Sequence, residues 1–128
     1  VQYSSKGGGG RPAISAAAIA CLFNAGEEDD THVPRMLAYA RRNLGNIGNN
    51  SFGHWHYAHF YYAQVMYRQG GESWESYRGQ IGKRLVAEAQ RDRDGAFWPQ
   101  GYIGTVYTTA TNLVILQLDK GSLPIYQR

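Results

Sequence analysis

Residues 54–71 read HWHYAHFYYAQVMYRQGG, and residues 73–91 continue with SWESYRGQIGKRLVAEAQR. From Trp55 to Tyr67 the first stretch carries no formal charge, and it predicts a helix over 54–69 that ends at two glycines. A helix that is uncharged on every side is expected to be buried. The second stretch, over 73–91, instead places its apolar residues on one face, which predicts an amphipathic helix. That face holds Trp74, Tyr77, Ile81, Leu85 and Ala89.

The same alternation extends in both directions along the 128 residues. Uncharged helices are expected over 12–25 and 105–119, and an amphipathic helix over 31–44. The order is therefore buried, amphipathic, buried, amphipathic, buried, which favours helical hairpins in two layers over a simple four-helix bundle. Residues 1–11 are expected to form a flexible glycine-rich lead-in, residues 12–121 the hairpin repeats, and residues 122–128 a polar tail.

An internal repeat accompanies this alternation. Gly26, Gly70 and Gly121 follow the three uncharged helices at comparable spacings. Gly53-His54-Trp55 precedes one uncharged helix, and Gly95-Ala96-Phe97-Trp98 precedes the next. Repeats of this length are typical of stacks or rings of supersecondary units.

The stretch from Lys83 to Gln90, followed by Asp94 to Trp98, resembles the QW-type repeat of squalene–hopene cyclases and related terpene cyclase and prenyltransferase toroids. Gln90, Gly95 and Phe97 match that repeat, and Gly53 with Trp55 matches its second half without a preceding Gln. The resemblance implies an all-α fold of α/α toroid hairpins, with buried inner and amphipathic outer helices. It further implies a partial barrel, from the C-terminal part of a larger toroid.

The catalytic patterns of those enzymes are not evident in this sequence. Class II terpene cyclases carry an Asp-x-Asp-Asp acid, whereas residues 27–30 read Glu-Glu-Asp-Asp and are expected to cap the following helix together with Thr31. Prenyltransferases bind zinc through Asp, Cys and His, but Cys21 lies among alanines and is interpreted as a small buried hydrophobe. No catalytic residue is assigned.

A cluster of histidines is the strongest polar candidate. His56 and His59 share a helix face, which makes them weak candidates for metal ligands, although His54 diverges from that face and no metal is assigned. The alternatives are a polar cavity lining and ordinary packing. We expect a cavity that binds a ligand, against the competing interpretation that the aromatic residues form core, and its predicted lining is His54, Trp55, His56, His59, Trp98, Tyr102, Tyr107 and Thr108.

Composition narrows the classes of partner. A formal net charge of +3 without any long basic run argues against nucleic acid. The longest charge-free run, 95–118, is interrupted by Pro99 and glycines, so no membrane span is expected. A single cysteine excludes an internal disulfide, and no cofactor motif is present.

The leading hypothesis is a non-catalytic toroid-repeat module that binds an apolar, isoprenoid-like small molecule or a protein partner. The alternative is a fragment of a terpene cyclase or prenyltransferase-like enzyme whose acid or zinc site lies outside this chain. A weaker alternative is a carbohydrate-active protein similar to polysaccharide lyases, because helical toroids host these too. An incomplete ring is also expected to expose an apolar flank that drives self-association.

Overall fold

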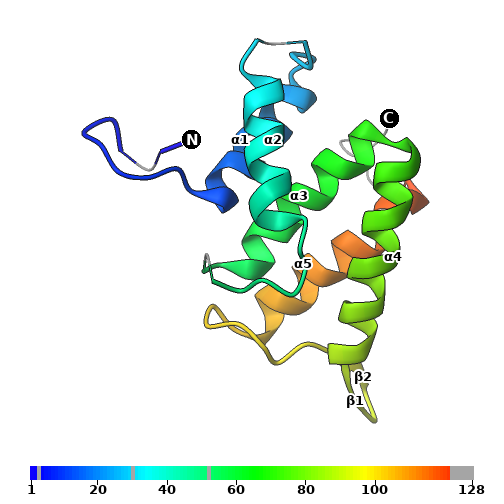
Figure 1. Cartoon of the computed structure of the whole chain (residues 1–128). Coiled ribbons are helices and arrows are strands. Elements are labelled where there is room, and N and C mark those ends of the chain that lie inside the picture. Colours follow the sequence, from blue (N-terminus) through cyan, green and yellow to red (C-terminus); the bar gives the residue numbers. More distant parts are fainter. Residues whose placement is uncertain (3, 30, 52, 122–128) are drawn as a thin grey trace.

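The computed structural model describes residues 1–2, 4–29, 31–51 and 53–121. Five α-helices dominate this part of the chain, and one small antiparallel hairpin accompanies them (Figure 1). The elements are α1 Pro12–Asn24, α2 Val33–Leu44, α3 Trp55–Gln69, α4 Gly71–Glu88, β1 Gln90–Asp92, β2 Gly95–Phe97, α5 Thr105–Gln117 and the short 3-10 helix η1 Leu118–Lys120.

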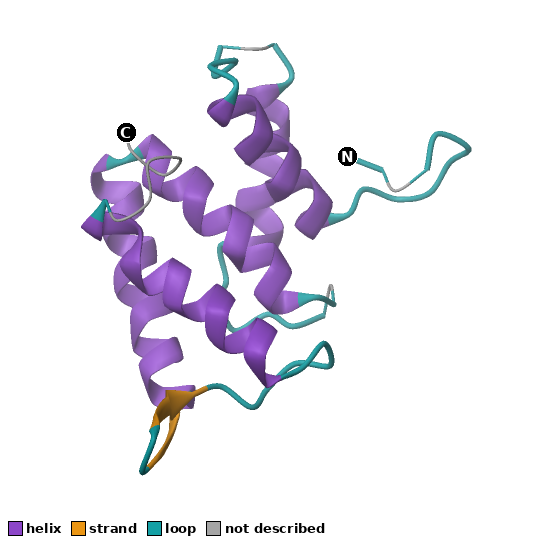
Figure 2. Ribbon diagram, turned by 180° about the vertical axis from the view of Figure 1, so that it is seen from behind, coloured by secondary structure: helices purple, strands orange, loops and turns teal. Residues whose placement is uncertain are grey.

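The three uncharged helices α1, α3 and α5 run in the same direction, with their N-terminal ends on one side of the molecule (Figures 1 and 2). α3 packs between α1 and α5, α2 covers α1 and part of α3, and α4 packs on α3. Two helical hairpins, α1–α2 and α3–α4, thus stand side by side, and α5 follows as a further helix. The described chain confirms a mainly helical protein, and the arrangement brings the starts of the uncharged helices together.

Local sequence explains where several of these helices begin and end. Pro12 occupies the first turn of α1, where its missing N–H costs no hydrogen bond. Gly26, with φ of +78°, directly follows the C-terminal cap of α1 and donates its N–H to the carbonyl of Phe23. Gly121 has φ of +61° after η1. The predicted glycine stops at these two positions are confirmed, because glycine adopts positive φ without steric cost.

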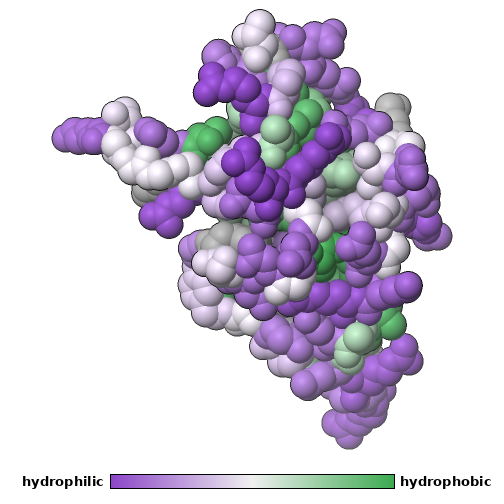
Figure 3. All heavy atoms as spheres, in the orientation of Figure 1, coloured by the Kyte–Doolittle hydropathy of each residue, from purple (hydrophilic) through white to green (hydrophobic). Residues whose placement is uncertain are grey.

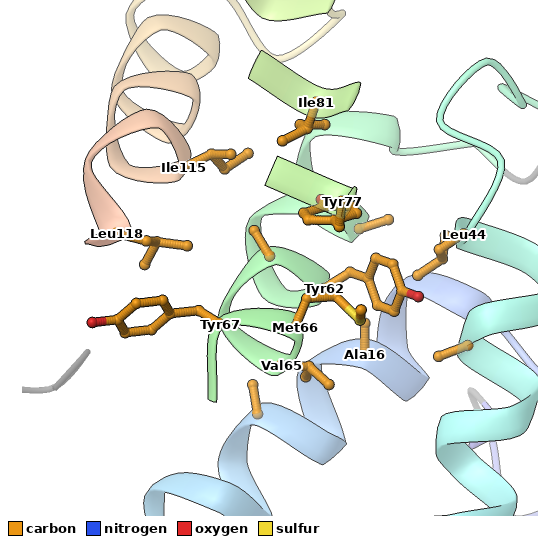
Figure 4. Close-up of a cluster of buried hydrophobic side chains, with 14 of the residues drawn as sticks. Ala16, Leu44, Tyr62, Val65, Met66, Tyr67, Tyr77, Ile81, Ile115 and Leu118 are labelled. Carbon is orange, nitrogen blue, oxygen red and sulfur yellow. The ribbon is translucent and has the colours of Figure 1, made fainter. Parts of the chain in front are cut away.

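The core is centred on α3, which supplies Ala58, Tyr62, Ala63, Val65 and Met66 as buried side chains. In Figure 4, Ile81 of α4 and Ile115 of α5 point toward one another beside α3, and Leu44 of α2 lies near Tyr62. The predicted apolar face of α4 is largely confirmed, since Trp74, Tyr77, Ile81 and Leu85 are buried. Burial of this apolar surface from several helices is the main contribution that holds the hairpins together.

The expectation that the uncharged helices are buried on every side is wrong for α1 and α5. Cys21 on α1 is exposed, so the interpretation of this residue as a buried hydrophobe is also wrong. On α5, Val106 and Leu113 are 85% and 41% exposed. Both helices lie at the ends of the row, where α3 covers one side only.

Two further expectations need correction. The helix expected over 73–91 ends at Glu88, and the β1–β2 hairpin follows it; the Asp92 carboxylate accepts hydrogen bonds from the N–H groups of Asp94 and Gly95 and closes the turn. The predicted cap of the second helix at Asp29, Asp30 or Thr31 is wrong: α2 begins at Val33, its N-terminal cap is His32, and that cap makes no side-chain hydrogen bond. Pro34 fits the first turn there, and Asp30 lies outside the described residues.

The described residues of the lead-in contain no helix. The ammonium group of Val1 donates to Ser15 Oγ at 2.8 Å, and the Tyr39 hydroxyl donates to the Gly10 carbonyl at 2.6 Å. The predicted tail, 122–128, lies outside the described residues. Within the described residues, none of the helices combines the length and the apolar character needed to cross a membrane.

Candidate functional site

A cavity of about 360 Å³ lies where α3 and α5 begin, and we call it the aromatic cavity. Aromatic rings from α3, α5 and the loop before α5 contribute to its wall, together with polar and charged side chains. Its lining consists of Asn50, His54, Trp55, His56, Tyr57, Arg84, Glu88, Gln100, Gly101, Tyr102, Ile103, Tyr107 and Thr108. The size and the largely apolar lining are typical of a small-molecule site.

His54 and Tyr102 connect the starts of α3 and α5 across the mouth of this cavity. The Tyr102 Oη lies 2.7 Å from His54 Nδ1, and their rings are 5.3 Å apart. His54 has φ of +49°, a left-handed conformation that is uncommon outside glycine. Tyr102 is 77% exposed, so this one hydrogen bond orients an otherwise open ring.

His56 occupies the inner wall and is half-buried. Its Nδ1 lies 3.2 Å from Oδ1 of Asn112, a fully buried residue of α5. Burial lowers the pKa of His56, against the opposing effects of the Asn112 hydrogen bond and the Glu88 charge. The imidazole is therefore neutral near pH 7.

Arg84 and Glu88 form the polar wall on α4. Arg84 Nε donates to Glu88 Oε1 at 2.8 Å, and the guanidinium lies 4.1 Å from the centre of the Trp55 ring. The guanidinium also donates to the Ile47 carbonyl, which accepts the Trp55 indole N–H as well. Arg84 and Glu88 both line the aromatic cavity, and their side chains are only 23% and 29% exposed.

A second cavity of about 570 Å³ adjoins the first and extends toward the start of α1; we call it the α1 cavity. It shares His54, Tyr57, Tyr102 and Ile103 with the aromatic cavity. Arg11, Pro12, Ala13 and Ile14 complete its lining. The N-terminal ends of all three uncharged helices therefore border one composite opening.

Six predicted lining residues reach the aromatic cavity: His54, Trp55, His56, Tyr102, Tyr107 and Thr108. His59 and Trp98 do not. His59 is fully buried in the core with its Nδ1 3.0 Å from the Tyr77 hydroxyl, and burial lowers its pKa to about 3. Trp98 is buried between α4 and α5, where its indole N–H donates to the Leu85 carbonyl at 2.7 Å.

No group of three or more His, Cys, Asp or Glu side chains within the described ranges is placed to hold a metal ion. His56 and His59, the weak metal candidates, instead direct their Nδ1 atoms toward Asn112 and Tyr77, respectively. Neutral imidazoles that face an amide and a phenol pack as hydrogen-bonding groups, and a three-donor zinc site needs more than this pair.

The residues of the predicted structural repeat lie at the joints between helices. Gln90 pairs with Phe97 in the β1–β2 register, and Gly95 closes the turn opposite Asp92. Gly53, with φ of +68°, precedes α3 at the equivalent joint. At each joint a tryptophan donates to a backbone carbonyl in or just after the preceding outer helix, Trp55 to Ile47 and Trp98 to Leu85.

The acidic stretch lies far from the aromatic cavity. Glu28 forms an ion pair with Arg68 at 2.5 Å, beside the C-terminal end of α3, whereas the cavity lies at the opposite end of that helix. Glu27 and Asp29 are exposed. Glu27, Glu28 and Asp29 therefore lie at the surface away from the cavity, and the expected capping of α2 is not observed.

Sequence reasoning missed part of the lining, namely Asn50, Arg84, Glu88, Gln100, Gly101 and Ile103. Arg84 and Glu88 stand four residues apart, so they share a helix face and signal an ion pair. The sequence gives no signal that this face turns toward Trp55. Gln100, Gly101 and Ile103 belong to an irregular loop, where periodicity carries no information.

The outer surface contrasts with the cavity. The face in view in Figure 3 is largely hydrophilic, and hydrophobic residues appear there in separate small patches.

Comparisons of the chain with family models, with curated proteins and with solved structures return no match. The function is therefore argued from the site itself.

Proposed function

We propose that this chain is a non-catalytic helical-hairpin module of the α/α toroid class that binds an apolar small molecule in the aromatic cavity. The observation that carries the proposal is the cavity itself, whose wall is formed by Trp55, Tyr57, Tyr102 and Tyr107. Aromatic rings bury much apolar ligand surface and lose little conformational entropy on binding.

The toroid assignment is supported by the order and direction of the helices. α1, α3 and α5 are uncharged, run in parallel and form one row, and the amphipathic α2 and α4 return between them. The joint formed by Trp55 with Ile47 recurs with Trp98 and Leu85. A repeated joint between parallel inner helices is what a ring or stack of hairpins requires.

An apolar ligand suits this cavity better than a protein partner does. The charged groups Arg84 and Glu88 neutralise each other at 2.8 Å, so they leave little net charge to attract a polar macromolecular surface. The cavity is a concave pocket at the ends of helices, and pockets of a few hundred Å³ enclose small molecules.

One observation favours the carbohydrate alternative. Tyr102 is 77% exposed and lines a cavity that also contains Arg84 and Glu88, and an exposed ring beside charged groups can stack against a sugar. The experiment below therefore includes an oligosaccharide. Binding of the sugar without binding of an apolar probe would favour this second function.

The proposal is tested by titrating the chain with the neutral fluorescent probe N-phenylnaphthylamine and, separately, with a soluble oligosaccharide. We expect probe fluorescence to saturate with one site and the sugar to leave the tryptophan emission unchanged. Tyr107→Ala is expected to weaken probe binding about tenfold, because it removes an aromatic wall. Tyr39→Ala, a partly buried tyrosine of α2 outside this lining, is the matched control and is expected to bind like the unmodified chain. Absence of saturable probe binding contradicts the proposal.

A further inference from the structure

We propose that the aromatic cavity selects apolar molecules that carry a hydroxyl group, and that His56 and Thr108 accept the hydrogen bond from that hydroxyl. This inference rests on the proposed function and specifies the chemistry of the ligand. The inference rests on the polar groups at the inner wall that have unused hydrogen-bonding capacity. It also follows from the placement of the two cavities.

The first step concerns the tautomer of His56. Oδ1 of Asn112 lies 3.2 Å from His56 Nδ1, and an amide oxygen can only accept. The imidazole therefore donates from Nδ1 and presents the lone pair of Nε2 to the cavity that it lines. Asn112 is fully buried, and its Nδ2 has no hydrogen-bond partner among the described residues. A buried amide of this kind is costly to keep, because buried polar groups are nearly always hydrogen-bonded.

The second step concerns Gly101, where two acceptors converge. A Cβ at Gly101 would lie 2.8 Å from Thr108 Oγ1 and 3.7 Å from His56 Nε2. The Thr108 hydroxyl donates to the Gly104 carbonyl at 3.1 Å, which leaves its oxygen lone pairs as acceptors. Any side chain at Gly101 would fill the space beside these acceptors, and the φ of +98° favours glycine there.

The third step concerns charge. A carboxylate or phosphate placed here would meet lone pairs on His56 and Thr108 and the negative charge of Glu88, which oppose the attraction of the Arg84 guanidinium. An ammonium group would meet the nearby Arg84 guanidinium, and Glu88 is already paired with that guanidinium at 2.8 Å. Burial also keeps His56 neutral by lowering its pKa. An uncharged donor, a hydroxyl, fits these groups best.

The fourth step concerns the apolar body of the ligand. Tyr57 and Ile103 line both the aromatic cavity and the α1 cavity. Beyond them the α1 cavity offers Pro12, Ala13 and Ile14. A molecule with its hydroxyl at His56 can therefore extend its apolar part over Tyr57 toward the start of α1.

The test uses the unmodified chain and four ligands with the same naphthylethyl body: the alcohol, its methyl ether, the amine and the carboxylate. Affinities are measured by ligand fluorescence and calorimetry at pH 7.5. The ether keeps the oxygen and lacks the proton, so we expect the alcohol to bind about three- to tenfold tighter than the ether, and tighter than both charged ligands. A parallel decyl series tests whether the preference is independent of the shape of the body.

A variant identifies the acceptor. His56→Phe is expected to remove most of the preference for alcohol over ether. His32→Phe, which changes an exposed histidine at the start of α2, is the matched control and should keep the preference. In the unmodified chain, nitrogen NMR is expected to show His56 protonated at Nδ1 and not at Nε2, the tautomer that leaves Nε2 free to accept from the ligand.

The outcomes separate the two proposals. If none of the ligands binds in either series, the proposed function fails. If the ligands bind but the ether matches the alcohol, or if the amine or carboxylate binds best, the hydroxyl inference is overturned and the apolar site stands. A proton found on Nε2 of His56 also overturns it. The ligand series does not depend on the folding of any variant.

Discussion

α3 and α5 are both uncharged helices, yet the protein surrounds them very differently. α3 contacts each of the other four α-helices, whereas α5 packs chiefly on α3 and η1. Tyr62 and Val65 on α3 are 2% and 0% exposed, but Val106 on α5 is 85% exposed. The helices without charge are therefore the three that form the row α1, α3 and α5. Position within that row decides how much of each helix is covered.

The largest expected effect on stability comes from truncating a buried side chain of α3. Tyr62→Ala is expected to lower the free energy of unfolding by about 3–5 kcal/mol, because it removes a large ring from a site that neighbours on several helices hold in place. Chemical denaturation followed by circular dichroism measures this. A loss below about 1 kcal/mol would mean that α3 is not the packing centre described here.

The second prediction uses His59, which lies on α3 and is buried in a neutral form. Its pKa is about 3 in the folded chain, compared with 6.5 for an ordinary histidine. The unfolded chain therefore binds a proton below pH 6.5 that the folded chain does not, so this residue makes stability fall as pH decreases from about 6.5 toward 3. The slope is about 1.4 kcal/mol per pH unit for one proton.

The control for this prediction is His59→Gln, compared with the unmodified chain at several pH values. The carboxylates titrate in both proteins, so the difference between the two curves isolates His59. We expect the variant to be less stable at pH 7.5 and to lose less stability on acidification. Parallel curves would show that His59 is accessible to protons in the folded state.

The third prediction compares the two tryptophan joints on either side of the α3–α4 hairpin. Trp98→Phe removes the indole donor to the Leu85 carbonyl, which keeps a hydrogen bond from the Ala89 N–H, and it is expected to cost about 1 kcal/mol. Trp55→Phe is expected to cost a similar amount, because the Ile47 carbonyl still accepts from Arg84. Thermal unfolding of both variants measures the two costs, and a loss above about 3 kcal/mol for either variant would contradict the presence of a second donor at that joint.

The smallest effect on stability is expected at the open side of α5. Leu113 is 41% exposed, so Leu113→Lys should change the free energy of unfolding by no more than about 0.5 kcal/mol. If this flank drives association of two copies, as an uncovered apolar face favours, the substitution should shift sedimentation toward the monomer. An unmodified chain that stays monomeric at high concentration would remove the basis for that expectation.

The sequence predicted the helices well because each carries its own signal. The charge-free run over 55–67 and the apolar stripe of Trp74, Tyr77, Ile81 and Leu85 depend on residue spacing alone, and the structure places them as expected. The β1–β2 hairpin was missed because its strands have three residues each, too few to show a period. The exposure of Cys21 was missed because it depends on what lies beside α1, not on α1 itself.

The cavity was predictable only in part for a similar reason. His54, Trp55 and His56 are contiguous at the start of a helix, and Tyr102 to Thr108 precede or begin the next, so parallel helices bring the two groups together. The placement of His59 depends on the rotation of α3 about its axis, and that of Trp98 on the path of the chain between β2 and α5; three-dimensional packing sets both. Arg84 of α4 contacts the Trp55 ring of α3, and only the tertiary structure shows this contact.

The one-sided attachment of α5 has a consequence for how the chain opens locally. A helix held on one side detaches at lower free energy than one enclosed on all sides, so the amide protons of α5 should exchange with deuterium faster than those of α3. Tyr102, Ile103, Tyr107 and Thr108 belong to α5 or to the loop before it. Each such detachment of α5 removes part of the wall of the aromatic cavity. A ligand bound there would therefore stabilise the attached position of α5 and slow amide exchange throughout this helix.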